Sequence, residues 1–294
     1  MRADAPEREG PCERRPLGNV LVATDFSPGA ARAVARAARL PMCRGATLTV
    51  LHVQPPACAP EDRAQAEQAL RRAAAVVAEA ARAAHVDVFT RLVEGLPFVE
   101  NIRGALHGRN ELVVLGRHGT RAFRELLLGS TAERVIRKGD TSILVVASRP
   151  VAAYERPLVA VDCSDTSRLA LELAWRLTDG SVVALDVVHA YEPILEAALE
   201  NPLETKRRAE AAVEAFLASS PASPPATVAL RDGDARHLIL DVAAQTGADL
   251  LALGTHGRSG LGHVLLGSVA EGVIRGASCD VVVARAIGSS FKLP

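Results

Sequence analysis

The stretch LGTHGRSGLGHVLLGSVAE, residues 253–271, decides the fold of this chain. It begins at the end of an apolar run, 248–253, and leads into a short helical pattern, 269–275. The run reads as a buried strand. Glycines between a strand and a helix allow close approach to the backbone, and the N–H groups of the helix start suit a phosphate. The stretch therefore predicts a strand, a phosphate-binding loop and a helix, in that order.

The same spacing of glycines occurs earlier in the chain. In residues 115–133, LGRHGTRAFRELLLGSTAE, two glycines three positions apart are followed after nine residues by Gly-Ser, as in the later copy. Other landmarks repeat at a nearly constant separation: Asp25 and Asp162 lie 137 residues apart, and Gly95 and Gly233 lie 138 apart. Each unit is large enough to fold alone. The repeat therefore indicates a duplicated domain.

Each copy alternates short apolar runs with helical patterns. In the first copy we expect strands at 19–25, 46–53, 86–93, 111–115 and 143–146, and helices at 28–40, 61–84, 96–107 and 130–138. Ser27 is expected to cap the first helix, with proline at its first position. The alternation predicts parallel sheets covered on both faces. We expect a disordered tail over 1–16, rich in Arg, Glu and Pro, and two α/β domains, 17–149 and 156–286.

The composition argues against several classes of protein. Of the 294 residues 49% are hydrophobic and the net charge is zero, whereas a nucleic-acid-binding protein usually carries a basic field. No apolar run reaches the ~18 residues of a membrane span, and the N-terminus lacks the apolar segment of a signal peptide. The five cysteines are scattered, which predicts free thiols and no metal site. We expect a cytoplasmic protein that binds neither nucleic acid nor membrane.

Together, these motifs resemble the universal stress protein family in its nucleotide-binding subclass. The resemblance rests on the strand-terminal Asp25 and Asp162, on the segments Leu-His-Val and Val-His-Ala that end at Val53 and Ala190, and on both copies of Gly-x2-Gly-x9-Gly-Ser. It covers nearly the whole chain. It implies two tandem open five-stranded parallel sheets, each of order 3-2-1-4-5, of the adenine-nucleotide alpha-hydrolase-like kind. A ligand would lie beyond the carboxyl ends of strands 1 and 4.

The resemblance implies an ATP site in each copy. In the first copy the implied ATP-binding residues are Ala23, Asp25, Val53, Gly116, His118, Gly119, Gly129, Ser130 and Thr131. In the second they are Ala160, Asp162, Ala190, Gly254, His256, Gly257, Gly267, Ser268 and Val269. The glycine loops and helix starts would hold the phosphates, and the aspartates would bind the ribose or adenine end. Mg²⁺ would accompany the nucleotide with only a modest requirement, because the loops lack the Lys-Ser/Thr pair of a P-loop.

The same residues also have purely structural explanations. Ser130 and Ser268 each stand three residues before a glutamate, which is the spacing of a capping box. Both serines would then be expected without any ligand. The aspartates would cap the turn that follows each first strand, as aspartate often does.

The chain contains no residues that we can name as catalytic. It has no P-loop, no dinucleotide-binding motif and no Gly-x-Ser-x-Gly motif, and no acid–base pair is positioned to activate water. We therefore expect an ATP-binding regulator of the stress response, not an enzyme. Two alternatives stay open: a nucleotide-free dimerisation scaffold, and a slow ATPase or phosphotransfer enzyme.

The two copies are expected to pair with each other but to bind ATP unequally. Their last strands, 143–146 and 280–283, would be exposed apolar edges in isolated sheets, so we expect them to pair within the chain as a pseudo-dimer. A further homodimer of two chains stays open. The second loop has glycine where the first has Ala122 and Arg124. A strained Ala122 would weaken the first site, unless the arginine compensates by binding phosphate.

Overall fold

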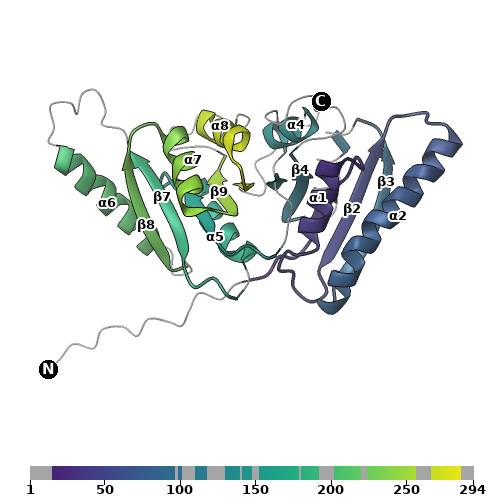
Figure 1. The fold of residues 1–294 in the computed structure, drawn as a ribbon, viewed down its shortest axis with the longest axis horizontal. Helices are drawn as coiled ribbons and strands as arrows, with labels where there is room; N and C mark the ends of the chain where they lie inside the picture. Colours follow the sequence, from purple (N-terminus) through teal and green to yellow (C-terminus); the bar gives the residue numbers. More distant parts are fainter. Residues whose placement is uncertain are drawn as a thin grey trace.

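The computed structural model describes residues 15–96, 99–100, 110–117, 130–139, 141–147, 152–178, 180–191, 202–219, 224–255 and 266–285. The part from β1 to β5, called here the first half, consists of β1 (Val20–Ala23), α1 (Pro28–Ala37), β2 (Thr47–Gln54), α2 (Pro60–Ala83), β3 (Asp87–Glu94), β4 (Leu112–Gly116), α4 (Ser130–Lys138) and β5 (Ser142–Val146). Strands and helices alternate here as the sequence predicts, except between β3 and β4, where the predicted helix lies almost wholly outside the described residues (Figure 1).

The part from β6 to β10, the second half, repeats this order. It consists of β6 (Pro157–Ala160), α5 (Asp165–Leu177), β7 (Leu185–Tyr191), α6 (Pro202–Ala218), β8 (Ala226–Asp232), α7 (Ala235–Thr246), β9 (Leu250–Gly254), α8 (Ser268–Gly276) and β10 (Asp280–Ala284). The expected helix at 96–107 and the tail over 1–16 lie almost wholly outside the described residues.

The strands form one sheet of order β3-β2-β1-β4-β5-β10-β9-β6-β7-β8. Each half contributes five parallel strands in the predicted order 3-2-1-4-5. The halves join where β5 and β10 run antiparallel, with Leu144 opposite Val282. Pairing through the last strands is thereby confirmed. The two expected sheets are continuous, because each last strand supplies the missing neighbour of the other.

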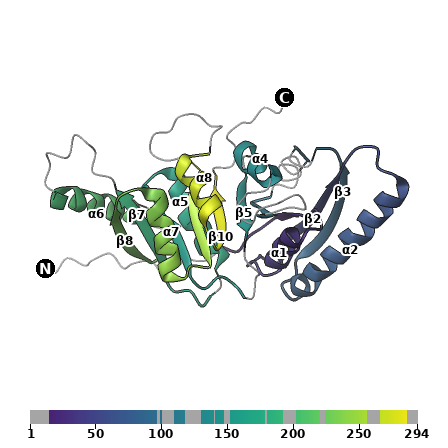
Figure 2. The same cartoon turned by 45° about the horizontal axis from the view of Figure 1, so that its top comes forward.

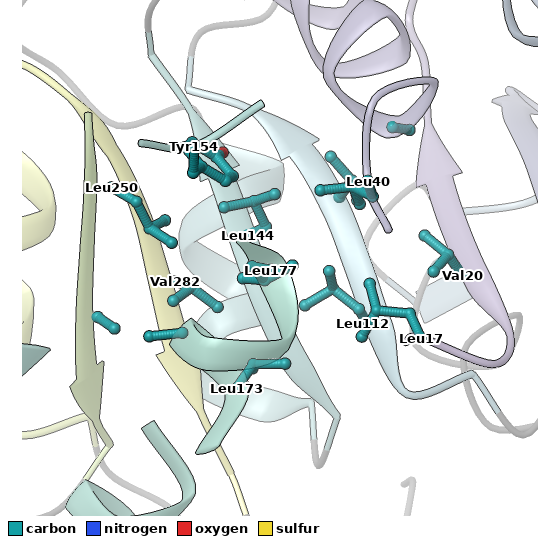
Figure 3. Packing of buried hydrophobic residues seen from close by; sticks show 14 of the residues in the cluster. Leu17, Val20, Leu40, Leu112, Leu144, Tyr154, Leu173, Leu177, Leu250 and Val282 are labelled. Carbon is teal, nitrogen blue, oxygen red and sulfur yellow. The ribbon is translucent and has the colours of Figure 1, made fainter. Parts of the chain in front are cut away.

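Two layers of helices cover the sheet. Alternate strand residues point to opposite faces, so each face has apolar side chains that pack against one layer of helices. Val20 and Val22 belong to a buried cluster with residues of α1, α2, α5 and α6, whereas Leu21 belongs to a cluster with residues of α4, α7 and α8. The first cluster crosses the β5–β10 seam, where Leu144 and Val282 lie beside Leu177 of α5 (Figure 3). The seam is therefore part of the core.

The start of the first helix follows the sequence prediction. The Ser27 hydroxyl accepts a hydrogen bond from the Ala30 N–H at 3.1 Å, and Pro28 is the first helical residue. The helix ends at Ala37, three residues before the predicted end at 40. Within the described residues, no helix has both the length and the apolar character that a membrane span requires.

Candidate functional site

The first and fourth strands of each half are neighbours, and their carboxyl ends lie at the same edge of the sheet. In the first half β1 pairs with β4, with Val22 opposite Val114, and in the second half β6 pairs with β9, with Val159 opposite Ala252. Strand order reverses at this point: β2 lies on the far side of β1, and β5 lies on the far side of β4. In the second half, β7 and β10 flank β6 and β9 in the same way. Ligands of open α/β sheets bind in such crevices. The sites implied by the sequence therefore lie at an edge suited to a ligand.

The aspartate after each first strand shapes the turn that follows it. Asp25 accepts a hydrogen bond from the Ser27 N–H at 3.0 Å, and Asp162 accepts one from the Ser164 N–H at 3.1 Å. The Ser164 hydroxyl donates a second bond to the same oxygen of Asp162, at 2.5 Å. The structural explanation is thus confirmed for one oxygen of each carboxylate. The second oxygen of Asp162 has no hydrogen-bond partner among the described residues.

The glycine that ends each fourth strand is required by packing. A Cβ on Gly116 would lie 2.5 Å from the carbonyl carbon of Gly29, and one on Gly254 would lie 2.5 Å from Oγ1 of Thr166. The first turns of α1 and α5 therefore pack directly on the ends of β4 and β9. Close helix–strand approach is sufficient to explain both glycines. A contact of either glycine with phosphate stays a prediction.

The start of α8 differs from the capping box that Ser268 suggests. The N-cap residue is Gly267, with φ −61° and ψ 148°, and Ser268 is already the first helical residue. The first helical hydrogen bond joins the Glu271 N–H to the Gly267 carbonyl at 2.9 Å. Ser268 is exposed and forms no hydrogen bond with another described residue. The capping explanation is wrong for this serine, because Gly267 holds the N-cap position.

The backbone N–H groups of this helix start are not all available. The Gly267 N–H donates to the Thr255 carbonyl at 2.9 Å. The next two N–H groups, of Ser268 and Val269, have no partner among the described residues. In the first half Ser130 opens α4, and Thr131 follows it half-buried. A phosphate at α8 would therefore be bound by groups from position 268 onward.

A histidine near the end of each second strand fixes the neighbouring turn. The Nδ1 atom of His52 lies 2.7 Å from the Thr24 carbonyl oxygen, and that of His189 lies 2.7 Å from the Val161 carbonyl oxygen. The backbone positions predicted to meet adenine, Val53 and Ala190, follow directly. Both are half-buried at the same edge. The histidines therefore align the ends of strands 1 and 2.

Two residues at this edge are not indicated by the sequence. Phe26 and Cys163 occupy equivalent positions after the aspartates, with φ of 62° and 63°. The Phe26 ring lies 4.2 Å from the His52 ring, centroid to centroid. Positive φ is uncommon for such residues. Neither residue type is typical of a left-handed turn. Only their equivalent positions in the repeat, directly after the aspartates, could have indicated this conformation.

Several predicted contacts lie outside the described residues. These are His118, Gly119 and Gly129 in the first loop, and His256 and Gly257 in the second. The loop positions 122, 124, 260 and 262, on which the unequal affinities rest, are also outside them. In the described parts of the chain, no group of three or more His, Cys, Asp or Glu residues could hold a metal ion.

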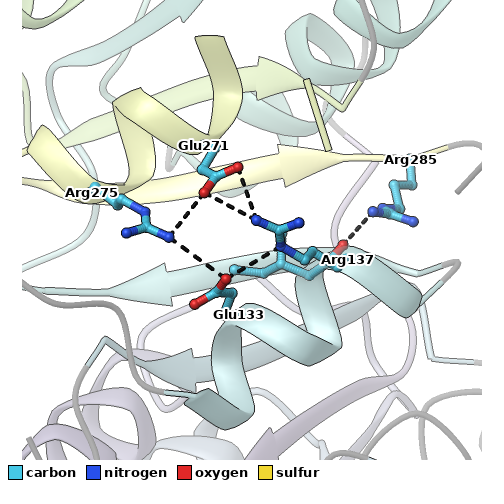
Figure 4. Close-up of polar contacts among 6 residues, drawn as sticks. Glu133, Arg137, Glu271, Arg275 and Arg285 are labelled. Atoms are coloured by element: carbon cyan, nitrogen blue, oxygen red, sulfur yellow. Dashed lines mark hydrogen bonds and ion pairs between the residues drawn. The ribbon is translucent and has the colours of Figure 1, made fainter. Parts of the chain in front are cut away.

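The two helices whose N-terminal ends belong to these candidate sites, α4 and α8, lie side by side above the seam (Figure 2). Glu133 and Arg137 of α4 face their repeat equivalents Glu271 and Arg275 of α8 (Figure 4). Ion pairs link the helices from Arg137 to Glu271 at 3.0 Å and from Arg275 to Glu133 at 3.6 Å. The two candidate sites are thus joined by charged groups one turn into each helix.

Comparisons with known proteins agree with this arrangement. The model of the universal stress protein family matches the chain twice, over residues 16–147 and 153–285. Universal stress protein Rv1996 of Mycobacterium tuberculosis is 30% identical over 307 residues, covering 90% of this chain and 94% of that protein. Universal stress protein Rv2005c of the same organism is 32% identical over 185 residues, covering 60% of this chain and 62% of the relative, less than two thirds of its length.

Solved structures show the same fold. A universal stress protein from Archaeoglobus fulgidus superimposes with a TM-score of 0.69 at 20% identity, covering 91% of this chain and 98% of that one. A putative universal stress protein from Pseudomonas aeruginosa superimposes with a TM-score of 0.63 at 18% identity. At these identities the likeness concerns the fold, including its tandem arrangement.

Proposed function

Since this chain belongs to the universal stress protein family, we propose that it acts in the stress response as a regulator that binds ATP in each half. The observation that carries the proposal is the start of α8. Its first helical residue, Ser268, is exposed and makes no hydrogen bond to another described residue, although a capping role would have occupied its hydroxyl. A helix start whose first N–H groups and hydroxyl have no partner among the described residues favours an anion.

In the second half, the proposed contacts use groups that have no hydrogen-bond partner among the described residues. The N–H groups of Ser268 and Val269 and the Ser268 hydroxyl would bind phosphate oxygens. The second carboxylate oxygen of Asp162 would accept a hydrogen bond from the ribose or adenine end, and Ala190 would offer backbone groups to adenine. The first half would bind ATP in the same way, through Asp25, Val53 and the start of α4. Mg²⁺ would enter with the triphosphate.

In this role the protein is cytoplasmic and signals by binding the nucleotide, not by converting it to a product. No residue among those described is assigned a catalytic role. The two rivals make different predictions: a scaffold binds no nucleotide, and a slow ATPase releases ADP beyond trace contamination. Stress signalling through a bound nucleotide requires only that the occupied and empty states differ in their contacts with a partner.

The test combines two measurements on the full chain. Mass spectrometry of the small molecule released on denaturation should identify an adenine nucleotide, and calorimetric titration of the emptied protein should show ATP binding. Asp162→Ala should abolish the second site, because the ribose or adenine end loses its acceptor. Ser219→Ala is a matched control, since that hydroxyl lies at the end of α6 and bonds the Phe216 carbonyl at 2.8 Å. Absence of binding by the unmodified chain would defeat the proposal.

A further inference from the structure

The charged contact between α4 and α8 is less symmetric than the repeat that produces it. Nη2 of Arg137 donates hydrogen bonds to both carboxylate oxygens of Glu271, at 3.1 and 3.0 Å. Nη2 of Arg275 donates to one of the same oxygens at 2.9 Å. Among the described residues, Glu133 has longer ion pairs, at 3.3 Å to Arg137 and 3.6 Å to Arg275 (Figure 4). Glu271 is therefore the shared acceptor of both guanidinium groups.

Glu271 lies in the first turn of α8, beside the proposed phosphate site. A carboxylate in a first turn is favoured by the helix dipole when no ligand is present. A triphosphate at the same helix start carries like charge, so an unpaired carboxylate there would oppose binding. Two guanidinium groups neutralise Glu271, and one of them, Arg137, comes from the opposite half. The second site thus depends on a group that its own half does not supply.

We propose that Arg137 of the first half is a positioning residue for the nucleotide site of the second half. It holds the first turn of α8 against α4 and neutralises Glu271 when the phosphates arrive. The inference rests on the proposed ATP site at Ser268. No contact between Arg137 and the nucleotide is required.

A second cross-half contact supports the dependence of α8 on the first half. The Arg117 guanidinium donates hydrogen bonds to the carbonyl oxygens of Arg275 and Ala277, at the C-terminal end of α8. Arg117 directly follows Gly116 and so belongs to the edge of the first site. Burial lowers the pKa of Arg117 below its ordinary value, but the group stays charged at neutral pH. Side chains of the first half therefore hold α8 at both ends.

The expected size of the effect is modest, because the ring is partly open to water. Its four side chains are between 31% and 40% exposed, and exposed ion pairs contribute little individually. A closed ring of four charges contributes more than an isolated pair. We expect Arg137→Gln to weaken ATP binding at the second site about threefold to tenfold.

The experiment uses the full chain carrying Asp25→Ala, which leaves the second site as the binding site observed by calorimetry. Arg137→Gln should show the stated loss. Arg137→Gln leaves two carboxylates with one guanidinium group, Arg275. Adding Glu271→Gln should restore affinity to within about twofold of the Glu271→Gln single variant, because one carboxylate and one guanidinium group then remain. Arg71→Gln, which removes an exposed pair with Glu67 on α2, is the matched control and should leave affinity unchanged.

The site of the first half provides an internal comparison. In an Asp162→Ala chain, Arg137→Gln should weaken the first site less than it weakens the second, because Glu133 has the longer pairs. Unchanged affinity at the second site would overturn the inference, and so would a loss that persists in the double variant, which would indicate a structural role. If the unmodified chain binds no ATP, the proposed function fails and this inference fails with it.

Discussion

The two ends of the β5–β10 seam have equivalent backbones but different side chains. Asp280 begins β10 and Ser142 begins β5, at matching places in the repeat. Asp280 accepts a hydrogen bond from the Ala147 N–H at 3.0 Å, and Ser142 accepts one from the Arg285 N–H at 3.1 Å. Thus, at equivalent places in the two halves, a backbone N–H donates a hydrogen bond to a side chain of the opposite half. Only the acceptor differs, a buried carboxylate at one end and a hydroxyl at the other.

The carboxylate has further partners that the hydroxyl lacks. Asp280 also binds Nε of Arg36 at 3.0 Å and the Tyr154 hydroxyl at 2.7 Å, and the Arg36 guanidinium lies 4.0 Å from the centre of the Tyr154 ring. The repeat equivalent of Arg36 is Leu173, which is buried in the core. If two first halves paired with each other, Arg36 would face a serine. The seam therefore favours pairing of unlike halves within one chain.

At the C-terminal ends of α4 and α8, equivalent backbone groups are again bound by side chains that are not equivalent in the repeat. The last carbonyl groups of α8 are bound by Arg117, and those of α4 are bound by Arg285. The two arginines are not equivalents, since Thr255 and Ala147 stand at the matching positions. Duplication therefore supplied the backbone frame, and different side chains complete the same contacts in the two halves.

The largest effect is expected from breaking the seam at its charged end. Asp280→Ala leaves Arg36 buried without its carboxylate, and removal of one member of a buried pair costs about 3–5 kcal/mol. Ser142→Ala at the equivalent place removes one neutral hydrogen bond and should cost about 1 kcal/mol. The free energy of unfolding in urea measures both. Equal losses would mean that the seam does not distinguish its two ends.

Two glycines of the second site are expected to have different roles, Gly254 in packing and Gly267 in ATP binding. Gly254→Ala places a Cβ against Thr166 of α5, and overpacking of this kind costs about 1–3 kcal/mol. Gly267→Ala brings a Cβ to 3.2 Å from the Thr255 carbonyl oxygen, a contact that a small shift relieves. We expect Gly254→Ala to lower the unfolding free energy and Gly267→Ala chiefly to weaken ATP binding. Urea unfolding and calorimetry on both variants would separate the two roles, and the reverse pattern would contradict this assignment.

The charged end of the seam should also make stability depend on alkaline pH. Burial, and then the charge of Asp280, raises the pKa of Tyr154 well above its ordinary value. Above pH ~10 the unfolded chain ionises this tyrosine while the folded chain keeps it protonated, so stability falls as pH rises. Tyr154→Phe should lose about 1.5–3 kcal/mol at pH 7, because the hydroxyl donates to a carboxylate, and it should remove this part of the alkaline fall.

Cys279 contributes a separate alkaline fall that the measurement must subtract. Burial raises the pKa of its thiol to about 12, so the folded chain keeps the proton that the unfolded chain releases earlier. Unfolding free energies at neutral and alkaline pH should therefore be compared in a Cys279→Ala chain with and without Tyr154→Phe. An identical alkaline slope in the two chains would show that Tyr154 ionises freely in the fold.

The sequence predicts the features that depend on pattern and repetition. The alternation of strands and helices follows from periodicity, the capped start of α1 from the pair Ser27 and Pro28, and the pairing of β5 with β10 from apolar edges, whereas the strand order is what the family resemblance implies. It does not predict the pair of Arg36 and Asp280, which lie 244 residues apart and have no counterpart in the repeat. It also misplaces Ser268, because the capping-box spacing does not show which residue takes the extended conformation of the N-cap.

The smallest expected effect compares the two residues with positive φ, Phe26 and Cys163. A side chain in this conformation costs about 1–2 kcal/mol, and glycine relieves that strain but loses about 0.5–1 kcal/mol through the freedom of the unfolded chain. Cys163 packs against the core cluster, and this contact reduces the gain. Cys163→Gly should therefore raise the unfolding free energy by no more than about 1 kcal/mol.

Phe26→Gly should not show this gain, because it also removes the contact between the Phe26 and His52 rings at 4.2 Å. Aromatic pairs contribute about 0.5–1.5 kcal/mol beyond the area they bury, which offsets the relieved strain. Urea unfolding of both variants should show Cys163→Gly as the more stable chain. If Phe26→Gly is equally stabilising, the ring pair contributes nothing to the fold. If both variants are destabilised, side-chain contacts at these two positions outweigh the backbone strain in both halves.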